Sequence, residues 1–169
     1  LMSLFIAGHK LIFGSYWNVM LITSQLILSS VSGIYIYKIT RLLFEKQEIA
    51  MIATIIYGLF PMTLYWVHTF SQETLFQSLL IFSIYHLIQY CSNEKLTSLI
   101  YSAFLFALCF LTKSHILIFS LFIPAILFLN IRSNKKRIFS ILGFTFICVI
   151  STLPYGLYHL KYNQTYVLS

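Results

Sequence analysis

The sequence contains no aspartate, and its only acidic residues are four glutamates. Charged residues of both signs make up 9% of the 169 residues, whereas an ordinary soluble domain has roughly 25%. A soluble fold of this size needs more charge to solvate its surface, so this scarcity excludes a soluble globular domain. The hydrophobic content of 59% excludes a disordered chain. These absences leave an all-α membrane protein.

Patterns of metal ligands and nucleophiles are also missing. The three cysteines are odd in number and lie in or beside apolar runs, so we expect small buried hydrophobic residues without disulfides. The sequence supports no metal site and no named cofactor, although a divalent metal stays open. The net charge of +7 is not gathered on one polar face, which excludes a nucleic-acid binder.

Charged residues and prolines divide the chain into six apolar stretches, each near the roughly 20 residues that a helix needs to cross a bilayer. We expect a single domain over 1–169, a polytopic transmembrane helix bundle of about six spans, with an outer interfacial helix at 1–15. Only Lys113 and Ser114 separate the fourth and fifth spans, which favours a tight hairpin, because a continuous helix would place Lys113 in mid-membrane. The predicted spans are 16–37, 49–67, 73–90, 96–112, 115–131 and 138–158.

The basic residues set the expected orientation, because cytoplasmic loops of membrane proteins carry an excess of lysine and arginine. One set of loops holds eight of the eleven basic residues, and the other holds Lys10, Lys113 and Lys161. We therefore expect the first set in the cytoplasm, and both chain ends and the turns at 68–73 and 113–115 outside. The first set consists of Lys38, Arg41, Lys46, Lys95, Arg132, Lys135, Lys136 and Arg137.

Glu73 is the most informative polar residue, because this topology places no other acidic residue outside. It follows Ser71 at a predicted helix start. It is therefore either a first-turn residue behind a Ser71 cap or a carboxylate that lines an outer cavity. Lys113 is either a lipid-headgroup anchor or a phosphate contact. His115 stands beside it.

Other polar residues carry weaker signals. His68 and Lys10 lie on the expected outer side, where they contact either headgroups or substrate. His86 lies within a predicted span, and we expect it to be hydrogen-bonded inside the bundle.

Several short motifs follow one another in a specific order. This order resembles the membrane glycosyltransferases of the C-type superfamily, above all the branch with protein O-mannosyltransferases, aminoarabinose transferases and related bacterial enzymes. The resemblance covers nearly the whole chain. The motifs are LIFGSY at 11–16, RLLFE at 41–45, YGLFP at 57–61, SQETLF at 71–76, FALCFLTK at 106–113 and LPY at 153–155.

The resemblance implies transfer of a sugar from a polyprenyl-phosphate donor to a lipid, glycan or protein acceptor in an outward-facing cavity. It implies a carboxylate base, which we expect upstream of Leu1 in a longer protein, and basic side chains or a metal at the leaving phosphate. The family's second acidic position matches Glu73, and its Thr-Lys turn matches Thr112 and Lys113. Tyr158 and His159 depart from the Arg-Asn pair of the closest subfamily.

Two other functions stay open: a transporter or flippase for lipid-linked sugars, and a non-catalytic scaffold subunit. A transporter needs polar residues through the midplane and paired broken helices, whereas the mid-helix residues here are mostly Leu, Ile and Phe. The expected partners are membrane lipids, the lipid-linked sugar and an acceptor. The wealth of Ile, Phe, Lys, Ser and Tyr is typical of an AT-rich genome, and it favours a bacterial cytoplasmic membrane over the endoplasmic reticulum.

Overall fold

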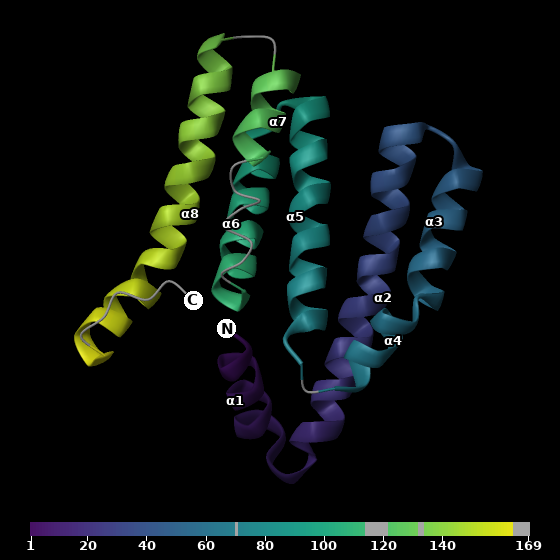
Figure 1. Cartoon of the computed structure of the whole chain (residues 1–169), viewed down its shortest axis with the longest axis vertical. Helices are drawn as coiled ribbons and strands as arrows, with labels where there is room; N and C mark the ends of the chain where they lie inside the picture. The colour runs from purple at the N-terminus through teal and green to yellow at the C-terminus, as the bar shows by residue number, and fades with distance from the viewer. Residues whose placement is uncertain (70, 114–121, 132–133, 164–169) are drawn as a thin grey trace. The chain divides into compact units, whose positions relative to one another are not determined.

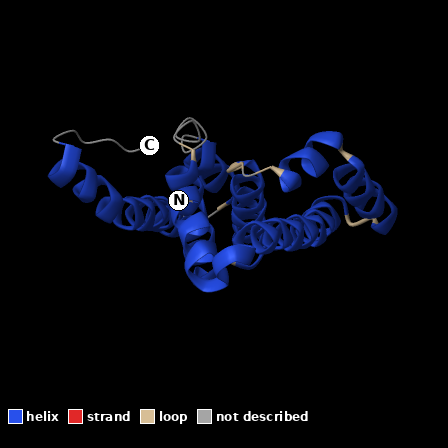
Figure 2. Ribbon diagram, turned by 90° about the horizontal axis from the view of Figure 1, so that it is seen from below, coloured by secondary structure: helices blue, strands red, loops and turns tan. Residues whose placement is uncertain are grey.

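The computed structural model confirms the all-α prediction. It describes residues 1–69, 71–113, 122–131 and 134–163, and within these ranges all regular structure is helical and no strand occurs (Figure 2). The chain divides into two compact units, unit 1 from Leu1 to Tyr85 and unit 2 from His86 to Ser169. Helix α5 (Glu73–Asn93) begins in unit 1 and ends in unit 2.

Unit 1 contains four helices before α5. Gly14 has a φ of 52°, a left-handed conformation that glycine adopts readily, and it ends the first helix so that the chain turns into the second. Phe60 is extended and Pro61 starts a new helix, so the third and fourth helices meet at a 48° bend. These helices are α1 (Met2–Phe13), α2 (Trp17–Phe44), α3 (Gln47–Leu59) and α4 (Pro61–His68), with a 3₁₀ turn at Gly14–Tyr16 (Figure 1).

Unit 2 contains the end of α5 and the helices α6 (Leu96–Thr112), α7 (Phe122–Asn130) and α8 (Asn134–Asn163). Helices α6 and α8 lie side by side (Figure 1). The rings of Phe106 and Phe144 are 5.8 Å apart, and the Cys148 thiol donates to the carbonyl of Ala103 at 3.4 Å. The guanidinium of Arg137 links the start of α8 to the end of α7, because it donates to the carbonyl of Ile131.

The number of spans is not confirmed at six. Three stretches are long and apolar enough to cross a membrane, and the bent pair of α3 and α4 makes a fourth. Helix α6 is apolar but has only 17 residues. The predicted span 115–131 falls partly outside the described residues. The three long stretches are Met2–Phe44, Glu73–Asn93 and Lys135–Tyr158.

Polar side chains share the interior with apolar ones, and large apolar side chains cover the outside. Gln25, Ser102 and Ser140 are completely buried, whereas Leu11 is 88% exposed and Leu129 is 80% exposed. Helices in a membrane pack through small and polar residues, because lipid chains solvate the large apolar ones. The buried faces of the helices are therefore more polar than their apolar sequences indicate, and the chain is an integral membrane protein.

Candidate functional site

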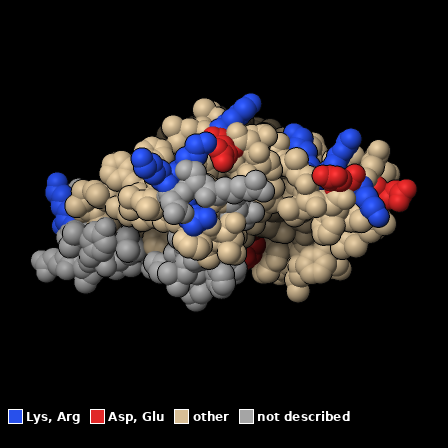
Figure 3. Space-filling view, turned by 90° about the horizontal axis from the view of Figure 1, so that it is seen from above, with Lys and Arg blue, Asp and Glu red and all other residues tan. Residues whose placement is uncertain are grey.

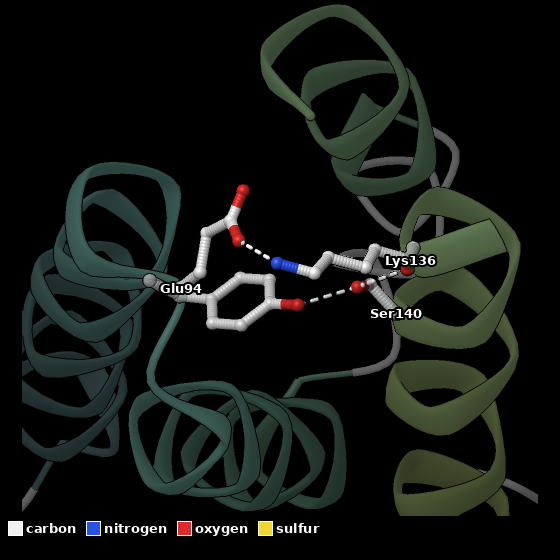
Figure 4. Close-up of polar contacts among 4 residues, drawn as sticks. Glu94, Lys136 and Ser140 are labelled. Atoms are coloured by element: carbon white, nitrogen blue, oxygen red, sulfur yellow. Dashed lines mark hydrogen bonds and ion pairs between the residues drawn. The ribbon is translucent and has the colours of Figure 1, made fainter. Parts of the chain in front are cut away.

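Each unit gathers charged side chains at one end (Figure 3). In unit 1, α2 ends and α3 begins on either side of Glu45 and Lys46, which brings their charged termini together. In unit 2, Glu94 after α5 forms an ion pair with Lys136 at the start of α8 (Figure 4). The expected cytoplasmic loops thus share one end within each unit.

Glu73 lies at the opposite end of unit 1. Gln25 of α2 donates from its Nε2 to the carbonyl of Ser71 at 3.2 Å, which fixes the start of α5 beside the first half of α2. Arg41 lies about 24 Å further along α2, at 1.5 Å of rise per residue. This distance separates the surroundings of Glu73 from the charged end of unit 1.

The start of α5 has the predicted cap. The amide of Glu73 donates to the Ser71 hydroxyl at 3.3 Å, and Glu73 is half-buried in the first turn. A carboxylate in this place is stabilised by the positive end of the helix dipole. The cap does not exclude a second role, because the side chain lies at the end of unit 1 that faces away from the charged loops.

Gln25 is a further candidate site residue, which the sequence analysis did not single out. It is completely buried, and its amide joins α2 to the segment before α5. One signal was available, since Gln25 is a strong hydrogen-bonding group inside the predicted span 16–37, where such groups are costly without partners.

Four buried side-chain oxygens of unit 1 have no hydrogen-bond partner among the described residues. An unsatisfied buried polar atom costs about 1–3 kcal/mol, and native structures keep such atoms rare. A concentration of them within one unit therefore calls for a ligand or for water. The atoms are Gln25 Oε1, Thr63 Oγ1, Thr74 Oγ1 and Ser78 Oγ.

Lys113 directly follows α6 in unit 2. Its backbone is extended, its amide donates to the carbonyl of Cys109 at 2.9 Å, and its side chain is half-buried. Helix α6 is about 25 Å long, so Lys113 and Lys95 stand at its two ends. Lys113 and Glu73 belong to different units, and His115 lies outside the described residues.

The remaining predicted residues have varied surroundings. His68 is exposed at the end of α4, and the Lys10 ammonium lies 4.7 Å from the centre of the Trp17 ring. His9 joins α1 to α2, because its Nε2 lies 2.8 Å from the Ser24 hydroxyl. His86 packs its ring 5.5 Å from that of Tyr101.

The ionisable residues do not form a metal site in the part of the chain that the structure describes. No group of three or more His, Cys, Asp or Glu side chains could hold an ion there. Cys91, Cys109 and Cys148 form no disulfide with one another; Cys109 is buried, whereas Cys91 and Cys148 are half-buried.

Helices whose buried faces include polar side chains and whose outer faces are apolar are typical of helical integral membrane proteins. The sequence model of the dolichyl-phosphate-mannose-protein mannosyltransferase family matches residues 1–155. The chain belongs to this family, and it is a membrane glycosyltransferase of the mannosyltransferase type. No curated protein and no solved structure matches it.

Proposed function

We propose that this chain uses a sugar carried on a polyprenyl phosphate and transfers it to an acceptor hydroxyl at the outer face of a bacterial cytoplasmic membrane. The family match carries the proposal, because it defines the class of enzyme over residues 1–155. The acceptor is a lipid, a glycan or a protein.

The charge distribution within each unit supports the outer face. Basic loops stay in the cytoplasm, so the charged ends of unit 1 and unit 2 face inward. The start of α5, which carries Glu73, then faces outward, and so does the end of α6, which Lys113 follows. The distances of about 24 Å along α2 and about 25 Å along α6 are most of the roughly 30 Å hydrocarbon thickness.

The reaction assigns different chemistry to these two residues. The acceptor oxygen attacks the anomeric carbon, the bond from that carbon to the phosphate oxygen breaks, and polyprenyl phosphate leaves with the electron pair. The hydroxyl proton passes to a carboxylate base. Within unit 1, Glu73 is our candidate for holding the acceptor hydroxyl. Within unit 2, and independently of it, Lys113 is our candidate for binding the leaving phosphate as a point charge.

Three further side chains belong to the same proposal. His115, His68 and Lys10 share the outer side in the predicted topology, where they contact the donor phosphate or its neighbouring headgroups. The half-buried position of Lys113 favours it over exposed His68 as the main phosphate contact, because partial desolvation strengthens a charge–charge interaction.

Reconstitution of the intact protein with radiolabelled polyprenyl-phosphate mannose and membrane acceptors tests the proposal. We expect label to move to an acceptor while free polyprenyl phosphate accumulates in equal amount. Donor that crosses the bilayer uncleaved would show a flippase instead. No cleavage and no movement, with folded protein, would show a scaffold.

A further inference from the structure

The unpartnered oxygens of unit 1 gather near the start of α5. Gln25 Oε1 belongs to the amide whose nitrogen donates to the Ser71 carbonyl, so it lies beside that segment too. Thr74 is in the first turn of α5 and Ser78 is one turn further on. All three side chains are more than nine-tenths buried.

Contacts along α5 show which of its faces meets α2. Ser71 is hydrogen-bonded to Gln25, and the rings of Phe82 and Tyr85 lie 4.6 and 4.9 Å from the ring of Tyr35. Residues three, four and seven apart share a helix face. Ser78, four residues before Phe82 and seven before Tyr85, therefore lies on the face of α5 that meets α2.

Helix α4 adds a third side to this region. It packs against α2, and its inner face buries Thr63 and Val67, which are four residues apart. The chain reaches α4 through the break at Phe60 and Pro61. Within a membrane, non-helical backbone is tolerated where it is buried in protein or lines a polar cavity. The break between α3 and α4 is therefore consistent with a ligand-binding site next to α4.

The chemistry of the four oxygens selects the ligand. They are neutral hydroxyl and amide acceptors, and the positive end of the α5 dipole is already matched by Glu73. A phosphate here would meet a carboxylate of like charge. A sugar ring instead presents uncharged hydroxyls that donate to such oxygens and accept from Thr and Ser.

We propose that Gln25, Thr74 and Ser78, with Thr63 of α4, form a subsite for the sugar ring of the donor. The phosphate is bound outside this subsite. The inference rests on the proposed function, and it adds that unit 1 recognises the sugar through hydrogen bonds with uncharged side chains. Sugar specificity then depends on the hydroxyls of these helices.

Two near-isosteric variants of the intact protein test the subsite, Thr74→Val and Ser78→Ala. We expect each to lower kcat/KM for polyprenyl-phosphate mannose about tenfold, the effect of one lost hydrogen bond. Thermal unfolding should show no loss of stability, because each variant removes an unsatisfied hydroxyl. Ser32→Ala is the matched control, since Ser32 is completely buried on α2 but donates to the carbonyl of Leu28 in its own helix. It should keep kcat/KM within about twofold of wild type.

Donors that lack one sugar hydroxyl sharpen the test. With wild type, one such deoxy donor should react about tenfold more slowly than the complete donor. Thr74→Val should use this deoxy donor as well as wild type does, because the hydroxyl that would have bonded the missing group is already gone. If both variants keep wild-type kcat/KM while wild type transfers mannose, the oxygens hold only water, and the subsite is refuted with the proposed function intact. If folded wild type transfers no sugar from polyprenyl phosphate, the proposed function fails and the subsite fails with it.

Discussion

The two units treat their buried polar side chains differently. In unit 2, Ser140 donates to the Lys136 carbonyl (Figure 4), and its hydroxyl lies 2.5 Å from that of Tyr90. Ser98 donates to Gln89. In unit 1, four buried oxygens have no partner among the described residues. Unit 2 therefore joins its helices through several buried polar groups, whereas we propose that some of the buried oxygens of unit 1 bind the donor sugar.

The difference follows from the lipid that surrounds the helices. Lipid chains are as apolar as leucine, so helices in a membrane associate through packing and interhelical hydrogen bonds. A hydroxyl that donates its hydrogen to another helix can no longer donate it to a substrate. We infer that the frame of the enzyme and its sugar-binding groups are divided between the two units.

The largest expected effect is an all-or-none difference in labelling within each unit. In a background without native cysteines, Lys46→Cys and Lys95→Cys should resist a membrane-impermeant thiol reagent, and Gln72→Cys should react from outside. All three positions are exposed, so access depends on the side of the membrane. Labelling of intact cells, followed by a mass-shift gel, measures it. The reverse pattern would refute the outer-face site. Opposite results for Lys46 and Lys95 would contradict the prediction that both of these loops are cytoplasmic.

The next effect is on turnover in unit 1. Glu73→Gln keeps shape and removes charge, so turnover should fall by about 10²-fold or more, the lower range for a positioned acid–base group. A purely capping role should cost at most about 1 kcal/mol of stability. Transfer from polyprenyl-phosphate mannose is the readout.

Glu48→Gln is the control for this variant, because Glu48 also lies in the first turn of a helix, α3, but at the charged end of unit 1. It should keep wild-type turnover. Wild-type turnover in Glu73→Gln as well would remove Glu73 from the site.

A smaller effect is expected in unit 2. Lys113→Ala should raise the donor KM about tenfold, because a hydrogen bond to a charged group contributes about 1.5–3 kcal/mol. Lys113→Arg should retain part of the affinity, since charge survives while geometry changes. Lys95→Ala, at the other end of α6, should leave the KM unchanged. If all three variants have the same donor KM, Lys113 is a headgroup anchor.

Much of the fold follows from hydropathy and a few local signals. Apolar runs located α2, α5 and α8, and the Ser71 cap at the start of α5 was expected from residue type alone. The count of six spans is not confirmed, because α6 has fewer residues than a helix needs to cross a membrane. The predicted span 115–131 also lies partly outside the described residues. A window of hydropathy does not show where a short apolar helix ends in three dimensions.

The polar interior could not be predicted from the same signals. A serine in an apolar run adds little to hydropathy whether it faces lipid or another helix, and the helices here lack a strong amphipathic period. Ser78 becomes informative only once Phe82 and Tyr85 show which face of α5 meets α2. Gln25 needed its partner on a segment 46 residues away.

The smallest expected effect compares stability between the units directly. Tyr90→Phe removes a hydroxyl that is bonded to Ser140, so it should lower the free energy of unfolding by about 0.5–1.5 kcal/mol. Thr74→Val removes a buried hydroxyl that has no partner, so stability should stay the same or rise. Unfolding of the intact protein in one detergent, without donor, measures both. A neutral Tyr90→Phe together with a destabilising Thr74→Val would reverse the comparison, because unit 1 would then be the part that depends on its buried hydroxyls for stability.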